Sequence, residues 1–298
     1  MRILHVSDLH LPPHFPSIPL SDWLGKRITG AFNFLFHRRG QFASFPFKLG
    51  KLAEFAREQS VDAVLCTGDY TLWGTDHELA AARQAIEPLV QSTRAFVTVP
   101  GNHDVYTHAV VKEGRFQRHF GDLLQNDEPE AAVDGSWPIV RWLGAEAVTI
   151  AVNSSVPHRL PWRSSGRLPQ KQLDALQELL EDSRVRERFV FVMTHHAPRL
   201  ANGRPDSAHH RLENAEAFLE VCSNIGRGAI LFGHVHQCYR LSLPELDIAL
   251  FNAGSATMFR SEGLWIFDLN SGGIHARRGK WDGDGYRLEG APDREGER

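Results

Sequence analysis

Short hydrophobic runs recur along the chain, and five of them stop abruptly at polar residues of the kinds that bind metals. Each run is four or five residues long and rich in apolar side chains, which suits a buried strand. The polar segments that follow are Ser7 to His10, Thr67 to Asp69, Pro100 to Asp104, Thr194 to His196, and Gly233 to His236. Ligands of α/β sheets bind beyond the carboxyl ends of the strands, so five such strands predict one shared site.

The pattern between these runs predicts helices that alternate with strands. The clearest helix covers 170–182, which follows Pro169 and carries leucines on one face with charged residues opposite. Further helices are predicted over 47–59, 76–92, 109–120 and 211–224, and a further buried strand over 147–152. This alternation favours a parallel sheet. Residues 121–138 are polar and contain Pro and Gly, which predicts a surface excursion.

After His236 the apolar runs are short and no longer alternate with predicted helices. Short runs over 237–243, 247–252, 262–268 and 273–277 predict antiparallel strands. Beyond about residue 280 the chain is polar and Gly-rich, so we expect it to fray. These patterns indicate one domain over residues 1–280, followed by a polar C-terminal tail over 281–298.

Residues 20–39 form a predicted helical insertion between the first polar segment and the second strand. After a Pro-rich loop, residues 21–36 carry an apolar helical stripe that includes Phe32 and Phe36, with basic residues around it. Such a helix can cap the core of the domain, which is the usual role of an amphipathic helix. Alternatively, its Phe-rich face can contact an anionic membrane surface and bring an amphiphilic phosphate ester to the site.

Composition narrows the class of protein. With 298 residues and 42% hydrophobic content, the chain can bury a core, and 33 basic against 36 acidic residues make binding of nucleic acid unlikely. The three cysteines, Cys66, Cys222 and Cys238, are far apart, which argues against a disulfide framework or a thiolate zinc site. No apolar stretch approaches the roughly 20 residues of a membrane span, and no secretory signal is recognisable, so we expect a cytoplasmic protein.

Each polar segment alone has an ordinary explanation, because Asp often caps a helix and a single His is usually a satisfied side chain. Five such segments at the ends of five strand-like runs are improbable by chance, so together they favour a metal site. Carboxylate, amide and imidazole ligands without thiolate suit Mn, Fe or Zn better than Ca or Mg. The loop from 199 to 210, with its pair His209-His210, is either a specificity loop or a solvated surface loop.

Together the segments resemble the calcineurin-like metallophosphoesterase superfamily, and in particular bacterial class III cyclic-nucleotide phosphodiesterase-like members. The resemblance extends from Asp8 to the stretch Asn252-Ala253-Gly254-Ser255. It implies an α/β fold, a four-layer α/β/β/α sandwich of two mixed sheets flanked by helices. It also implies two divalent or trivalent metal ions, one held by Asp8, His10, Asp69 and His236 and the other by Asp69, Asn102, His195 and His234.

In this resemblance Asp69 bridges the two metals, and His103 protonates the leaving oxygen or binds phosphate charge, which makes these two residues the catalytic ones. Many relatives orient the histidine with a second Asp shortly after the Gly-Asp pair. Here the chain reads Gly68-Asp69-Tyr70-Thr71-Leu72, so that carboxylate is missing. We assign Asp104 to securing its loop, and we choose His195 rather than His196 as the ligand because it directly follows its strand. His196 then supports the site or contacts the substrate.

These observations predict an enzyme that hydrolyses a phosphodiester or phosphomonoester of a small molecule with a metal-activated water. Two alternatives stay open. One is hydrolysis of a lipid-linked phosphate ester or pyrophosphate at a membrane surface, through peripheral contact of residues 20–39. The other is a metal-binding scaffold without catalytic activity, which the complete set of expected ligands disfavours. The sequence does not specify the oligomeric state.

Overall fold

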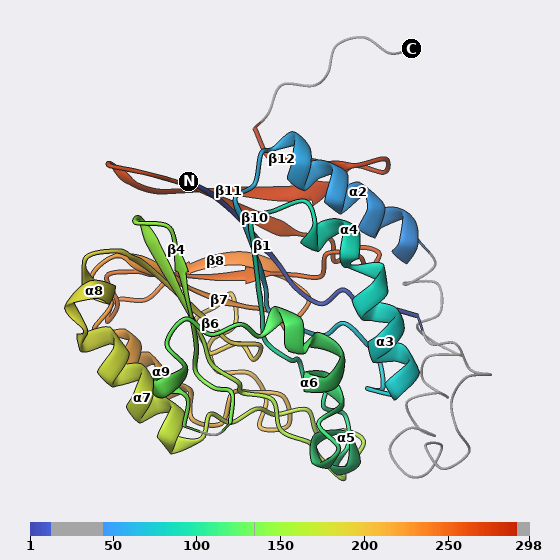
Figure 1. Ribbon diagram of the computed structural model, residues 1–298, viewed down its shortest axis with the longest axis horizontal. Coiled ribbons are helices and arrows are strands. Elements are labelled where there is room, and N and C mark those ends of the chain that lie inside the picture. Colours follow the sequence, from blue (N-terminus) through green and yellow to red (C-terminus); the bar gives the residue numbers. More distant parts are fainter. Residues whose placement is uncertain (13–43, 134, 291–298) are drawn as a thin grey trace.

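The computed structural model describes residues 1–12, 44–133 and 135–290, which fold into a pair of stacked β-sheets with helices on their outer faces (Figure 1). Each sheet has six strands. One hydrophobic core lies between the two sheets. A further core lies between each sheet and the helices that cover it. This arrangement confirms the predicted four-layer sandwich. The predicted insertion at 20–39, with its helix over 21–36, and residues 291–298 of the predicted tail lie outside the described residues.

The first sheet has the strand order β12-β11-β10-β1-β2-β3. Its parallel half consists of β1 (Arg2–Val6), β2 (Ala63–Cys66) and β3 (Ala95–Thr98). Val6 lies opposite Cys66, and Cys66 lies opposite Thr98, so the three carboxyl ends are level. The antiparallel half consists of β10 (Leu264–Asn270), β11 (Gly273–Trp281) and β12 (Tyr286–Leu288).

The second sheet has the strand order β4-β5-β6-β7-β9-β8. Its parallel strands are β5 (Ala147–Ala151), β6 (Phe189–Met193), β7 (Gly228–Phe232) and β9 (Ala249–Ala253). The edges are the antiparallel strands β4 (Ile139–Leu143) and β8 (Cys238–Ser242). The runs predicted at 237–243 and 247–252 do pair in antiparallel fashion, but β9 also pairs in parallel with β7, which the alternating pattern alone does not reveal.

Helices cover each sheet from outside because successive strand residues point to opposite faces. In β1, Ile3 enters the core between the sheets, whereas Leu4 packs under the helices. The first sheet is covered by α2 (Phe45–Glu58), α3 (Asp76–Ala85), α4 (Glu87–Val90) and α6 (Arg115–Phe120), and the second by α7 (Gln170–Glu181), α8 (Ser183–Arg186) and α9 (Ala215–Cys222). Within the described ranges, no helix combines the length and apolar character needed to cross a membrane.

Two predicted helices are broken in the structure. The helix expected over 76–92 stops at Ala85 and resumes as α4, where Pro88 lacks the N–H that a continuous helix would need. The helix expected over 109–120 divides into α5 (His108–Lys112) and α6 at Gly114, which has the left-handed φ of 60°. The predicted excursion contains the short 3-10 turns η5 (Gly121–Leu123) and η6 (Pro129–Ala131).

The expectation that the chain frays beyond residue 280 is wrong for residues 281–288. Strand β12 pairs with β11, with Trp281 opposite Tyr286. Tyr286 is buried against Phe55 of α2, with ring centroids 6.2 Å apart, and its hydroxyl donates a hydrogen bond to the carbonyl of Ala256. Tyr286 and Leu288 lie in a Gly-rich, charged segment and so give little sequence signal, but both are buried in the core between the first sheet and its helices.

We expect Tyr286→Ala to lower the free energy of unfolding by about 3–5 kcal/mol, because it removes a buried aromatic ring. Denaturation in urea, followed by circular dichroism, measures the change. The neighbouring Arg287 side chain is 47% exposed and paired with Asp282, so Arg287→Ala should cost no more than about 1 kcal/mol. Equal effects of the two substitutions would show that β12 is not part of the folded core.

Candidate metal centre

The predicted site residues converge at the common edge where the parallel strands of both sheets end. Asp8 and His10 follow β1, Asp69 follows β2, and Asn102 and His103 follow β3. The second sheet contributes His195 after β6 and both His234 and His236 after β7. Both sheets therefore contribute to the site, and the first sheet contributes more of its residues.

The backbone of this edge adopts conformations that ordinary residues avoid. Five of the expected ligands have left-handed φ angles: Asp8 at 53°, His10 at 47°, Asp69 at 61°, His234 at 74° and His236 at 50°. For a residue with a Cβ atom such a conformation costs about 1–2 kcal/mol, and residues of this kind cluster at functional sites. The loops are thus shaped to aim these side chains rather than to minimise local strain.

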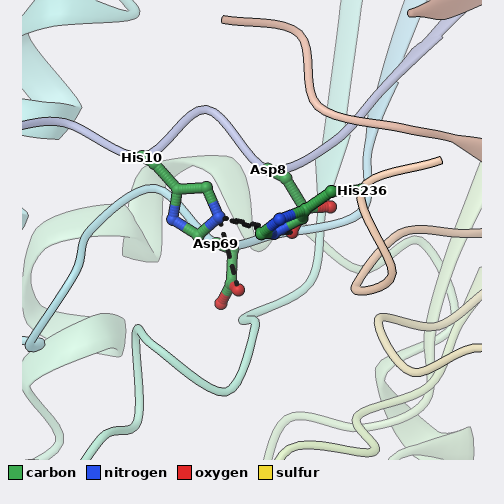
Figure 2. A group of neighbouring side chains, drawn as sticks. All are labelled: Asp8, His10, Asp69 and His236. Atoms are coloured by element: carbon green, nitrogen blue, oxygen red, sulfur yellow. Dashed lines mark hydrogen bonds and ion pairs between the residues drawn. The ribbon is translucent and has the colours of Figure 1, made fainter. Parts of the chain in front are cut away.

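Four side chains form the first group, and Figure 2 shows them pointing toward one another. Nε2 of His236 lies 3.0 Å from Oδ1 of Asp8 and 3.0 Å from Nε2 of His10. The same His10 nitrogen lies 3.9 Å from Oδ2 of Asp69. One candidate ligand atom from each residue lies within 4.8 Å of the others, which is the spacing of a metal-binding group.

Asp69 also faces a second group of side chains. Its Oδ2 lies 3.4 Å from Nε2 of His195, and that nitrogen lies 3.1 Å from Oδ1 of Asn102. Nδ1 of His234 lies 2.8 Å from the same Asn102 oxygen. The two groups therefore share Asp69, which is almost fully buried at 1% exposure.

The facing atoms fit a cation because each ring, in its neutral form, offers a lone pair to the site. Nδ1 of His10 lies 3.2 Å from the carbonyl of Thr71, and Nδ1 of His195 lies 2.7 Å from the carbonyl of Thr67. Nε2 of His234 lies 2.9 Å from the carbonyl of His210. A carbonyl only accepts, so these nitrogens carry the proton, and the opposite nitrogen of each neutral ring presents a lone pair to the site. Lone pairs that meet carboxylate and amide oxygens call for positive charge between them.

The electrostatics of the centre also favour positive charge. Burial by itself raises the pKa of Asp69, but the nearby His195 and His103 imidazoles outweigh burial and hold that pKa below its usual range. Burial alone lowers the pKa of His195, yet the charge of Asp69 outweighs it and raises the pKa to about 9. At His234, burial and the charge of His195 lower the pKa to about 3. The carboxylates thus attract cations. A protonated His195 can supply part of the positive charge, whereas His234 stays neutral.

Asp104 locks two of the ligand loops together. Its Oδ2 accepts hydrogen bonds from the backbone N–H groups of Asp69 at 2.8 Å and Gly101 at 2.9 Å. Its Oδ1 accepts from the N–H groups of Tyr70 and Thr71 and from the Thr71 hydroxyl. Burial and the charge of Asp69 raise the pKa of Asp104 to about 7, although these donors favour its carboxylate form. This geometry supports the loop-securing role expected for Asp104.

The stretch from Asn252 to Ser255 supports the loops from the other side. The hydroxyl of Ser255 donates to the carbonyl of Asp8 at 2.6 Å, and the Asn252 amide donates to the carbonyl of Gly233 at 2.6 Å. A Cβ atom at Gly233 would lie 1.9 Å from the Ser7 hydroxyl, so only glycine permits this close approach of the β1 and β7 loops. These contacts fix the positions of the loops that carry Asp8, His234 and His236.

His103 lies beside the first group but is oriented by the backbone. Its Nδ1 lies 2.6 Å from the carbonyl of Leu72, and its ring stacks on Tyr106 with centroids 5.8 Å apart. Its own N–H donates to Oδ1 of Asp69 at 2.8 Å. The Leu72 carbonyl therefore takes the place of the carboxylate that the sequence lacks. Because any residue has a carbonyl, no side-chain pattern could have revealed this partner.

The geometry separates the neighbouring histidines 195 and 196. His195 presents Nε2 to Asp69 and Asn102. Both ring nitrogens of the fully buried His196 have partners elsewhere: Nδ1 lies 2.8 Å from the Ser154 hydroxyl and Nε2 lies 2.9 Å from the carbonyl of Ser164. The His196 ring packs against His234 with centroids 4.5 Å apart. His195 is thus the better candidate ligand, and His196 supports His234 by packing. Sequence reasoning missed both partners, because the Ser154 hydroxyl belongs to no recognisable motif and Ser164 acts through its backbone carbonyl.

Comparison with known proteins places this site in a family. A family model described as calcineurin-like phosphoesterase matches residues 1–238. The chain is 28% identical over 269 residues to a probable cyclic nucleotide phosphodiesterase of Pseudoalteromonas sp. (strain SM9913), and this match covers 89% of the chain and 82% of the relative. It is also 28% identical over 191 residues to a 3',5'-cyclic adenosine monophosphate phosphodiesterase of Haemophilus influenzae, which covers 62% of the chain and 59% of the relative.

Solved structures agree at the level of the fold. A dimetal phosphatase from Danio rerio superposes with a TM-score of 0.62 at 12% sequence identity, covering 97% of this chain and 95% of that one. A purple acid phosphatase from yellow lupin gives a TM-score of 0.55 at 10% identity, covering 96% of this chain and 51% of that one. With its site residues assembled and its sequence matched over residues 1–238, the chain belongs to the calcineurin-like phosphoesterase family, whose members hydrolyse phosphate esters at a dinuclear centre of divalent metals.

Proposed function

We propose that this phosphoesterase hydrolyses a small-molecule phosphodiester, with a 3',5'-cyclic nucleotide as its substrate. The observation that supports the proposal is the convergence of seven candidate metal ligands from both sheets, in two groups that share the carboxylate of Asp69. The choice of substrate rests on the relatives, whose names describe cyclic nucleotide phosphodiesterases.

The ligand assignment follows the two groups of side chains. Asp8, His10, Asp69 and His236 would hold one metal, and Asp69, Asn102, His195 and His234 would hold the other. The donor set contains no thiolate, which supports Mn, Fe or Zn. When bound, a pair of such ions activates water as a nucleophile and stabilises the charge of the phosphoryl group. No nucleophilic side chain is needed.

The residues of this chain would position the reaction and move one proton. The backbone carbonyls behind His10, His195 and His234 hold each ring so that its lone pair faces the site. The Leu72 carbonyl accepts a hydrogen bond from Nδ1 of His103, so the imidazolium form of this ring would carry its second proton on Nε2 and could transfer it to the leaving oxygen. Because the cyclic diester retains an alkoxide leaving group of high basicity, such a donor is valuable.

The alternative interpretations have less support. A lipid-linked substrate was suggested by residues 20–39, which lie outside the described residues, so no contact in the structure favours it. The scaffold interpretation is disfavoured by the assembled ligand groups and by the family. A cytoplasmic location, the expectation that nucleic acid is not a partner, and peripheral membrane contact through residues 20–39 stay predictions.

The substrate proposal predicts that the Mn-loaded protein converts cyclic AMP to AMP and does not remove phosphate from AMP at a comparable rate. Chromatographic separation of cyclic AMP, AMP and adenosine measures both reactions. Asp69→Ala protein serves as the control for contaminating activities. If AMP, a single-stranded oligonucleotide or a long-chain lipid phosphate is hydrolysed with a higher kcat/KM than cyclic AMP, the cyclic nucleotide is not the substrate.

The bridging assignment predicts that Asp69→Ala loses both metals together with at least about a hundredfold in activity. His10→Ala and Asn102→Ala each remove a ligand from one group only, so they should retain more metal per chain. Elemental analysis of the purified variants measures the metal content. Asp76→Ala, which changes an exposed carboxylate in α3, should match the wild type. Full activity on bis(p-nitrophenyl) phosphate in Asp69→Ala would contradict a shared carboxylate.

The role of His103 predicts a dependence on the leaving group. His103→Ala should retain its metals and lose about 10²–10⁴-fold in rate on diesters with basic leaving groups. The loss should shrink for p-nitrophenyl esters, whose leaving group needs little protonation. A series of diesters with graded leaving-group pKa values gives the slope for each protein. Parallel slopes for wild type and variant would indicate that His103 binds phosphate charge instead.

A further inference from the structure

An exposed apolar turn lies next to the second group of ligands. In the segment 158–164, the N–H of Arg163 donates to the carbonyl of Leu160 at 3.2 Å and closes a turn. Leu160 is 45% exposed and Trp162 is 60% exposed, which makes Trp162 the most exposed large apolar residue of the described chain. Single exposed apolar residues are common, but two in one turn beside a site suggest a contact surface.

The base of the turn is fixed to the candidate metal centre. Ser164 donates its N–H to the carbonyl of His209 at 2.8 Å, and its hydroxyl lies 2.7 Å from Nδ1 of His210. The carbonyl of His210 in turn accepts from Nε2 of His234 at 2.9 Å. Two hydrogen bonds therefore connect Ser164 to a candidate metal ligand, and Trp162 is only two residues away. This also places the main chain of the predicted specificity loop at the site.

The turn is held in shape by contacts outside its apolar tip. Nε2 of His158 lies 2.7 Å from the carbonyl of Ser165, and the Arg163 guanidinium donates to Glu213 at 2.6 Å. The Ser165 hydroxyl donates to the same Glu213 oxygen at 2.9 Å. These contacts order the backbone while Leu160 and Trp162 stay exposed. An ordered aromatic surface loses little conformational entropy when it binds a ligand.

The charge around the turn suits an anionic ligand. Arg159, Arg167 and Arg211 are exposed, and Arg163 is partly exposed. Glu213 pairs with Arg163 and Arg167, and Glu216 pairs with Arg199. Asp206 is a further acid close in sequence, so Arg159 and Arg211 leave positive charge in excess on this surface. A ligand with an aromatic group and a phosphate would match both the indole and the arginines.

We propose that Trp162 is a specificity-determining residue whose indole stacks on the base of the nucleotide substrate, with Leu160 extending the apolar surface. The inference rests on the proposed function, because it takes the phosphate to be bound at the candidate metal centre. Aromatic stacking on a base is tolerant of base identity, so this residue would favour nucleotides over esters that lack a ring without selecting one base.

The test compares two inhibitors that share the phosphate but differ in the base. With Mn-loaded protein and bis(p-nitrophenyl) phosphate as the reporter substrate, we would measure the inhibition constants of AMP and of inorganic phosphate. Trp162→Ala should weaken inhibition by AMP about tenfold and leave inhibition by phosphate unchanged. Trp162→Phe, which keeps a stacking ring, should recover most of the affinity for AMP. Calorimetric titration of the same proteins with AMP gives a readout independent of turnover.

The matched control is Phe47→Ala, which removes an aromatic side chain that is 51% exposed but belongs to α2 on the outer face of the first sheet. It should leave both inhibition constants unchanged. Equal constants for AMP in wild type and Trp162→Ala would overturn the proposal, and so would a parallel loss for AMP and phosphate, which would mean that the turn only supports the metal centre. If cyclic nucleotides are not hydrolysed, the proposed function fails, but the contrast between AMP and phosphate still decides the role of Trp162.

Discussion

The repulsion between buried lone pairs at the joined edge of two sheets is the constraint on which this site depends. Asp8 and Asp69 are 0% and 1% exposed, and imidazole nitrogens and an amide oxygen point at the same volume. Buried groups of this kind are costly unless positive charge lies between them. Protons on the histidines can supply some of that charge, but the carbonyl partners of His10, His195 and His234 leave each neutral ring facing inward as an acceptor. Cation binding and stability of this edge are therefore linked.

A site of this kind needs two sheets that cannot slide past one another, because Asp69 must face ligands from both. The core between the sheets provides that rigidity. Phe191 of β6 packs on Phe267 of β10 with centroids 5.5 Å apart, and Phe251 of β9 packs on Trp265 at 5.0 Å. Interiors of this density transmit displacement instead of absorbing it. The left-handed residues of the loops direct the ligand side chains toward the site, and the hydrogen bonds of Asp104 hold the backbone of two of these loops in place.

The sequence was sufficient for the strands that end at the site, since each one stops at residues such as Asp8, Asp69 or His195 whose chemistry is distinctive. It was also sufficient, through the resemblance, for the four layers. It failed where structure depends on little side-chain information. Strand β12 buries only Tyr286 and Leu288, which give a weak pattern. The helical spacing of apolar residues continues past Pro88, so the sequence predicted one helix over 76–92 where the structure has two. The choice of His195 over His196 was made from the sequence by position alone, and the structure supplies the physical reason, because both ring nitrogens of His196 have other partners.

The orientation of His103 illustrates why such details escape a motif. A carboxylate partner would be visible in the sequence and would add negative charge beside Asp8 and Asp69. The carbonyl of Leu72 accepts the same hydrogen bond without a charge, while the Leu72 side chain packs in the interior at 5% exposure. Position 72 therefore buries its side chain and orients His103 through its backbone. The backbone carbonyls of Thr67, Thr71 and His210 orient the other rings in the same way, so the geometry of this centre is encoded mainly in the path of its loops.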